Sequence, residues 1–277
     1  MRIGVIIVAI LLITASTLPS WEMKQVRLAP QDVADYNNQG LAISVSCTLS
    51  YFYTVPGCGW VWLIDGIEEN ESFGVRFNMT DEVPFHDPCD TSACLTLDAL
   101  KIMLYDVLPP PADQSMNLRV YAAGEGGDPL GDLLGNVDFE PSYAGTASFT
   151  TEIIDFTKGG STPGLDLSGC GGDFVVILTW LNSTGHPCFV LDNISTCVES
   201  CAVDPDCCQM GTYPYVYPRT TPHTHYYGYF GSWLTDPDPT CDFRDSTTLC
   251  DEYGYIEGMI TSYFCTVSQA IEPSTWG

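Results

Sequence analysis

The chain is built from short apolar runs that are separated by clusters of glycine, proline, aspartate and asparagine. Several runs alternate apolar and polar residues with the two-residue period of a half-buried β-strand, as Phe73, Val75 and Phe77 do. The run at 174–180 carries apolar residues on both of its faces, which predicts a central strand covered on both sides. Strands are expected at 41–47, 59–64, 72–79, 95–107, 117–122, 148–156, 174–180, 188–191, 226–234 and 253–264.

Many short strands with frequent turn signals predict an all-β protein, a jelly-roll-like antiparallel β-sandwich stapled by disulfides. A helical fold is disfavoured because no window of about 12 residues carries a helical apolar stripe free of glycine and proline. The sandwich is expected to occupy residues 41–277 as a single domain, with a cysteine-rich insertion at about 197–222. Residues 21–40 are mixed and polar, and we expect them to form an N-terminal arm.

Residues 1–20 have the pattern of a secretory signal peptide. Arg2 supplies a positive charge, an uncharged apolar run follows at 3–13, and small or polar residues come next. The run is shorter than the roughly 20 apolar residues that a bilayer-spanning helix needs. We expect cleavage before Trp21 and a secreted protein, extracellular or at the cell surface, with no membrane attachment afterwards. The alternative is an N-terminal anchor that is retained.

The chain is strongly acidic, with 35 Asp and Glu against 9 Lys and Arg and a formal net charge of −26. Such a charge repels nucleic acid and anionic membrane surfaces, so neither is expected as a partner. Hydrophobic residues make up 45% of the chain, which is far more than a disordered acidic tail contains. The composition therefore predicts a folded core inside an acidic surface.

Thirteen cysteines in a chain with an export signal predict disulfides. Because the number is odd, at least one thiol is unpaired or bonds to another chain. The group Cys197, Cys201, Cys207 and Cys208 lacks a paired CxxC, so a disulfide knot is favoured there over a zinc site. Three bridges that would each close a short loop between predicted strands are Cys47–Cys58, Cys89–Cys94 and Cys241–Cys250.

The runs at 100–106, 118–121 and 172–177, together with Trp180, and the later pieces 232–233 and 254–260, occur in a characteristic order. With the loop at 126–131, this order resembles a jelly-roll-like β-sandwich module of secreted bacterial proteins, found beside extracellular peptidases and surface-anchoring tails. The resemblance covers about residues 70–265. It implies a fold and an extracellular address, but no activity, because function depends on sites rather than on the fold.

Aromatic residues are crowded into the stretch 213–233, where tyrosines alternate with prolines and valine. Exposed rings of this kind stack on sugar rings or dock against proteins. The alternative is that they pack in the β-sandwich core. The candidate binding residues are Tyr213, Tyr215, Tyr217, Tyr227, Tyr229 and Trp233.

Signals for a metal or for catalysis are sparse. Asp236, Asp238 and Asp242 lie in one acidic loop, which is a candidate structural calcium site because calcium takes several oxygen ligands. His223 and His225 alternate and could hold zinc, although the alternative is a polar loop. The remaining histidines are His86 and His186, and no Gly-x-Ser-x-Gly elbow surrounds a serine.

We therefore expect a non-enzymatic secreted binding module that recognises carbohydrate or an extracellular surface protein through its aromatic loop. One alternative is a structural subunit of an extracellular layer or filament, in which the odd cysteine contributes to self-assembly. Another is a secreted hydrolase whose site has no recognisable motif.

Overall fold

Antiparallel β-strands dominate the structure. The computed structural model describes residues 22–38, 47–52, 60–80, 89–92, 95–106, 114–124, 130–142, 147–192, 224–226, 228–229, 233–234 and 259–264. The elements are β1 (Glu22–Arg27), α1 (Pro30–Asn38), β2 (Cys47–Leu49), β3 (Trp60–Asp65), β4 (Ser72–Asn78), β5 (Thr96–Asp106), β6 (Met116–Ala123), β7 (Leu130–Phe139), β8 (Ser148–Asp155), β9 (Leu165–Asp166), the 3₁₀ helix η1 (Ser168–Cys170), β10 (Asp173–Trp180), β11 (Cys188–Leu191), β12 (Thr224–Tyr226), β13 (Gly228–Tyr229), β14 (Trp233–Leu234) and β15 (Ile260–Phe264).

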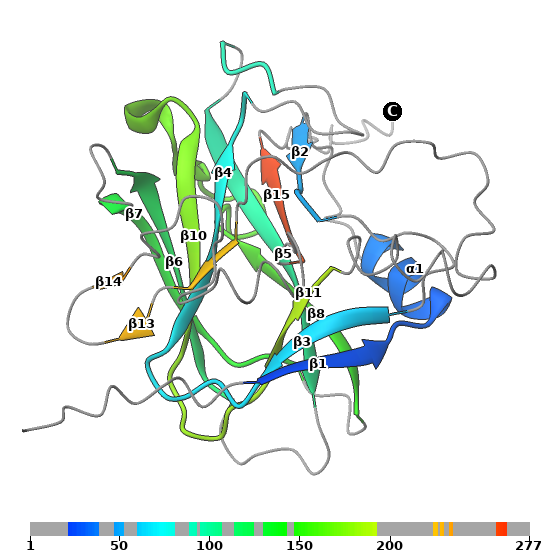
Figure 1. Ribbon diagram of the computed structural model, residues 1–277. Coiled ribbons are helices and arrows are strands. Elements are labelled where there is room, and N and C mark those ends of the chain that lie inside the picture. Colours follow the sequence, from blue (N-terminus) through cyan, green and yellow to red (C-terminus); the bar gives the residue numbers. More distant parts are fainter. Residues whose placement is uncertain are drawn as a thin grey trace, which may run out of the picture.

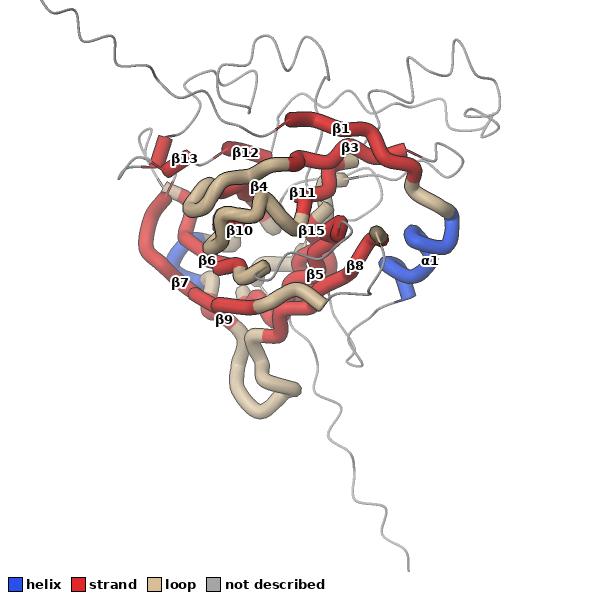
Figure 2. Tube along the Cα trace, turned by 90° about the horizontal axis from the view of Figure 1, so that it is seen from below, coloured by secondary structure: helices blue, strands red, loops and turns tan. Residues whose placement is uncertain are grey.

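The strands form two large sheets that face each other (Figures 1 and 2). The five-stranded sheet has the order β12-β4-β10-β6-β7. The eight-stranded sheet has the order β1-β3-β11-β5-β15-β2, and β8 and β9 also pair with β5. The chain crosses repeatedly between the two sheets, as it does in a jelly roll. The expected all-β, antiparallel fold class is confirmed.

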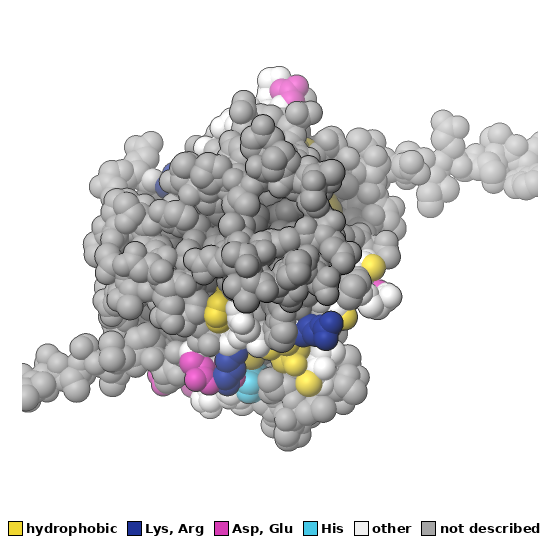
Figure 3. All heavy atoms as spheres, turned by 45° about the vertical axis from the view of Figure 1, so that its right-hand side comes forward, with side chains coloured by type: hydrophobic (Ala, Val, Ile, Leu, Met, Phe, Trp, Pro, Cys, Tyr) yellow, Lys and Arg dark blue, Asp and Glu magenta, His cyan; other side chains and the backbone are white. Residues whose placement is uncertain are grey.

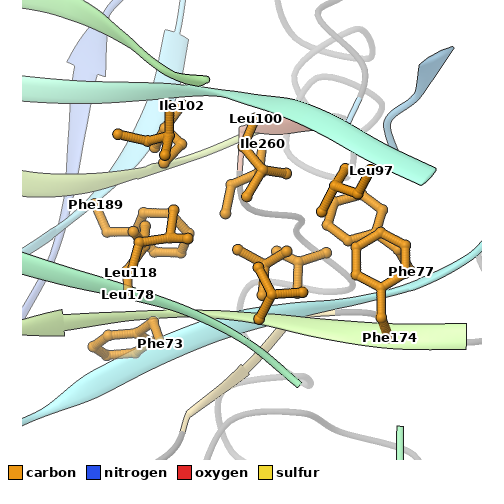
Figure 4. Close-up of a cluster of buried hydrophobic side chains, with 14 of the residues drawn as sticks. Phe73, Phe77, Leu97, Leu100, Ile102, Leu118, Phe174, Leu178, Phe189 and Ile260 are labelled. Atoms are coloured by element: carbon orange, nitrogen blue, oxygen red, sulfur yellow. The ribbon is translucent and has the colours of Figure 1, made fainter. Parts of the chain in front are cut away.

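The main hydrophobic core lies between the two sheets (Figure 4). Phe73, Phe77 and Phe174 enter it from the five-stranded sheet, and Leu100 and Ile102 enter it from β5. All five side chains are fully buried. Alternate residues of each strand therefore supply one continuous apolar layer, as the two-residue period predicts.

Strand β10 is covered on both faces, as expected from its uninterrupted apolar run. It lies at the centre of the five-stranded sheet, between β4 and β6. Val175 and Ile177 point away from the main core and pack against Tyr121 and Leu130 in a second, smaller cluster. Because both faces of β10 are buried, side chains that point to either face are mainly apolar.

Residues 22–38, which fall in the expected polar N-terminal arm, form a strand and a helix that pack on the eight-stranded sheet. Strand β1 pairs along its full length with β3 and extends the eight-stranded sheet. Helix α1 then covers the outer face of this sheet, where Tyr36 is buried with Leu63 and Met103. The helix begins at Pro30, and the Asp32 carboxylate accepts a hydrogen bond from the Ala29 N–H at 2.8 Å. The segment is polar because only one stripe of it faces the sheet.

Strand β7 was missed by the sequence patterns. It is an edge strand that pairs only with β6, and most of its residues are exposed or half-buried. Its backbone pairs with β6, and Leu134, Val137 and Phe139 pack against the main core, so the glycines and aspartates between them do not prevent the strand from forming.

The one disulfide among the described residues joins Cys47 to Cys89. The predicted bridges Cys47–Cys58 and Cys89–Cys94 are therefore wrong, although Cys47 and Cys89 are both bonded. Cys47 begins β2 in the eight-stranded sheet, and the Cys89 N–H donates to the carbonyl of Met79, just past β4 of the five-stranded sheet. The bridge therefore links the two sheets, and the fold brings together cysteines 42 residues apart.

Within the described ranges, no helix is long and apolar enough to cross a lipid bilayer. The predicted signal peptide, at residues 1–20, lies outside these ranges.

Candidate functional site

Most of the residues predicted to bind a ligand lie outside the described part of the chain. This holds for Tyr213, Tyr215, Tyr217 and Tyr227 and for Asp236, Asp238 and Asp242. Four of the cysteines predicted to form disulfides also lie outside it, namely Cys58, Cys94, Cys241 and Cys250.

Tyr229 and Trp233 fall on described strands. They are directly opposite each other in the antiparallel pair β13–β14. Just before this pair, β12 joins the edge of the five-stranded sheet by pairing with β4. The structure therefore brings two of the predicted aromatic binding residues into register beside a sheet edge.

A second group of chemically active residues lies on the eight-stranded sheet. Asp65 ends β3, Cys188 begins β11, and His186 precedes β11 by two residues. Because β3 and β11 are neighbours, with Phe189 opposite Ile64, the three side chains meet. The Cys188 Sγ lies 3.6 Å from Asp65 Oδ1 and 3.8 Å from His186 Nδ1, and His186 Nδ1 lies 3.8 Å from Asp65 Oδ1. We refer to Asp65, His186 and Cys188 as the Asp–His–Cys cluster.

Two glycines hold the loops of this cluster together. Gly66 and Gly185 both have positive φ angles, of 76° and 73°, which glycine adopts without strain. Gly185 also forms an isolated β-bridge with Ile67. The chain therefore turns immediately after Asp65 and immediately before His186, and the two turns lie against each other.

Lys24 on β1 orients the carboxylate of the cluster. Its ammonium group hydrogen-bonds Asp65 Oδ2 and lies 2.6 Å from Glu22 Oε1. The other oxygen of Asp65, Oδ1, is the atom that faces His186 and Cys188. Figure 3 shows a histidine side chain (cyan) at the surface beside acidic (magenta) and basic (dark blue) side chains. The carboxylate thus has one oxygen fixed by a cation and one directed into the cluster.

The electrostatics of the cluster leave the thiol neutral. Burial raises the pKa of Cys188, and the nearby Asp65 carboxylate raises it further. Burial also lowers the pKa of His186, which favours the neutral imidazole. Burial opposes ionisation of Asp65, but the hydrogen bond and charge of Lys24, together with smaller contributions from His186 and Cys188, lower the pKa of this carboxyl overall.

A cysteine nucleophile needs a lowered pKa and access to substrate. Cys188 has a raised pKa and is 1% exposed. The geometry therefore does not activate Cys188 as a nucleophile, even though cysteine, histidine and aspartate are the residue types of a catalytic triad. What the cluster offers is three different ligand atoms converging on one point.

Sequence analysis did not single out this cluster. The only local signal is that a histidine and a cysteine, His186 and Cys188, lie two residues apart. Asp65 is 121 residues away from His186 in the sequence, so no spacing could have connected it to the other two.

Comparison of the chain with protein-family models, with curated proteins and with solved structures finds no match. The resemblance to secreted bacterial sandwich modules therefore stays a prediction.

Proposed function

We propose that the protein is a non-enzymatic extracellular binding module that recognises carbohydrate through its aromatic segment at 213–233. The observation that carries this proposal is the register of β13 and β14, in which Tyr229 is opposite Trp233. Opposite positions of an antiparallel pair are cross-strand neighbours, and this pair of aromatic positions is where the proposed platform begins. Sugar rings stack on such platforms through their apolar C–H faces.

The location of this platform supports the proposal. The ribbon follows β12, which is one of the two edge strands of the five-stranded sheet. Binding residues are commonly presented on loops and edges that a rigid scaffold positions. The disulfide Cys47–Cys89 is of the type that persists in oxidising extracellular compartments.

The test is a glycan array followed by affinity measurement on the sugar that binds best. Tyr229→Ala and Trp233→Ala should each weaken binding by at least about tenfold, the loss typical of a binding hot spot. Tyr121→Ala is the matched control, because Tyr121 is a half-buried aromatic residue on the outer face of the five-stranded sheet and outside the β13–β14 ribbon. Binding that is unchanged in both variants, or that is absent for the wild type, would overturn the proposal.

A second candidate function is a subunit of an extracellular assembly, and the cysteines favour it. Cys170 and Cys188 are free, and Cys47 is bonded to Cys89. Nine of the 13 cysteines then remain, and nine cysteines cannot all pair within one chain. Light scattering on the oxidised protein, with and without reductant, tests this function. A monomer that reductant does not change would exclude a disulfide-linked assembly.

A further inference from the structure

We propose that the Asp–His–Cys cluster is a zinc site, with Asp65 Oδ1, His186 Nδ1 and Cys188 Sγ as its three protein ligands. This inference is independent of the carbohydrate-binding proposal, because the residues and the elements that carry them are different.

The distances between the three atoms are those of a nearly formed tetrahedral site. Zinc binds sulfur at about 2.3 Å and nitrogen or oxygen at about 2.0–2.2 Å. At tetrahedral angles these lengths place sulfur about 3.6 Å from the other two ligands, and nitrogen about 3.4 Å from oxygen. The observed separations are 3.6, 3.8 and 3.8 Å. Each ligand atom therefore needs to move by only a few tenths of an ångström.

The ligand types select the metal. Calcium and magnesium take oxygen ligands, so a thiol and an imidazole exclude them. Thiolate and imidazole together suit zinc and its neighbours among the transition metals. Three protein ligands leave the fourth position to water, as in zinc sites that keep an open position. Asp65 and His186 are 17% and 21% exposed, so solvent reaches this side of the cluster.

The surrounding charges match a divalent cation. Binding forms a zinc–sulfur bond and breaks the S–H bond of Cys188, and the proton passes to solvent. Glu22, Asp65 and the thiolate are then negative and Lys24 is positive, which leaves two negative charges in excess. Lys24 contacts Oδ2 rather than the ligand atom Oδ1, so it orients the carboxylate without occupying the site.

The test uses the full, oxidised chain after dialysis against a chelator, with Co²⁺ as a spectroscopic probe for zinc. We expect one equivalent of Co²⁺ to give tetrahedral visible bands and a thiolate-to-cobalt band in the near ultraviolet, and Zn²⁺ to displace it. Cys188→Ser should abolish the thiolate band. The control, Cys170→Ser, removes the other free thiol among the described residues and should keep the band.

The other two ligands are tested by affinity. Asp65→Asn and His186→Gln should each weaken Co²⁺ binding by at least tenfold, whereas Asp173→Asn should leave it unchanged. Asp173 is the matched control, because it too is a half-exposed carboxylate in an ion pair, with Arg76 at 2.6 Å. If Cys188→Ser fails to fold, His186→Gln decides, since His186 is partly exposed and its loss is better tolerated.

A wild type with no thiolate band would overturn the zinc site. A band that survives in Cys188→Ser would also overturn it, because the metal would then be held by cysteines elsewhere in the chain. Unchanged Co²⁺ affinity in folded His186→Gln would likewise overturn the zinc site, because His186 would then not be a ligand.

Discussion

Gly185 lies directly against the backbone of Gly66. A Cβ atom at position 185 would lie 2.8 Å from the Cα of Gly66, which is closer than real Cβ atoms approach backbone. The contact joins the turn that follows Asp65 to the turn that precedes His186. The absence of two side chains therefore sets how closely the carboxylate and the imidazole approach each other.

Gly185→Ala should destabilise the protein by more than the cost of placing an alanine at the positive φ angle of this position. A left-handed φ costs a non-glycine residue on the order of 1–2 kcal/mol, and the clash with Gly66 adds to this cost. Gly159→Ala is the matched control, since Gly159 has a φ of 71° and no atom within 4 Å of the added Cβ. Urea unfolding should show a loss that is about 1 kcal/mol or more greater for Gly185→Ala. Equal losses would mean that the loops separate at no cost.

Removing the Cys47–Cys89 bridge should lower the free energy of unfolding by about 4 kcal/mol, the loop-entropy value for cysteines some 42 residues apart. The measurement is urea unfolding of Cys47→Ala/Cys89→Ala under non-reducing conditions, and Cys170→Ala serves as the control. Peptide mapping of the unreduced wild type checks the pairing itself. A peptide that joins Cys47 to Cys58 would contradict the structure.

Lys101 gives the protein a pH dependence in the alkaline range. Its ammonium group is buried under helix α1, where it donates to the Tyr36 carbonyl at 2.9 Å and lies 4.3 Å from the Tyr36 ring and 5.5 Å from the Tyr263 ring. Burial lowers the pKa of Lys101 to about 8, from an ordinary value of 10.5. Between these two values the unfolded chain binds the proton and the folded chain does not, so the contribution of Lys101 to stability rises with pH.

The free energy of unfolding of the wild type, minus that of Lys101→Met, should therefore increase from about pH 7.5 to about pH 9.5 by on the order of 1–2 kcal/mol. Burial also raises the pKa of Tyr36 and of Tyr263, the latter to about 12, so both tyrosines contribute to the pH dependence of stability. Their contributions are the same in the two proteins and cancel in the difference. A difference that stays flat or falls would show that Lys101 keeps its proton in the folded state.

Asp106 should be a stability defect at neutral pH. It is fully buried, and neither carboxylate oxygen has a hydrogen-bond partner among the described residues. Burial, with a smaller contribution from the charge of Glu152, raises its pKa to about 6. Gln114 lies close enough to lower the pKa, but its amide nitrogen forms no hydrogen bond within the same residues. Because the folded-state pKa is above the unfolded value of 3.8, the folded chain holds the proton more tightly, and stability falls as pH rises from about 4 to 6.

Asp106→Asn removes this charge while keeping the shape of the side chain. At pH 7.5 it should stabilise the protein by on the order of 1–3 kcal/mol, because ionising a carboxyl whose pKa is raised from 3.8 to about 6 costs the folded state free energy that a neutral amide does not. At about pH 4 the gain should largely disappear, because Asp106 is then protonated in the folded state and about half protonated in the unfolded state, where its pKa is 3.8. Thermal unfolding at the two pH values measures the effect, and a variant less stable than the wild type at pH 7.5 would contradict it.

The sequence by itself determined the strands whose two faces differ and the strand whose faces are both apolar. Phe73, Val75 and Phe77 all enter the core because side chains alternate across a strand, and this rule needs no knowledge of neighbouring strands. The alternation of apolar and polar residues in the chain was therefore enough to predict the all-β class. It was not enough to predict β7, because its core-packing residues Leu134, Val137 and Phe139 are interspersed with glycine and aspartate and its place is set by pairing with β6.

Only the tertiary structure decided which distant residues meet. Cys47 has closer cysteines in the sequence than Cys89, yet the return of the chain past β4 brings Cys89 to it. Asp65 reaches His186 and Cys188 because β11 pairs with β3 and because two glycines let their turns touch. Each strand can in principle pair with any other strand, and the pairing that forms is the one that buries the whole core. No local pattern carries that information.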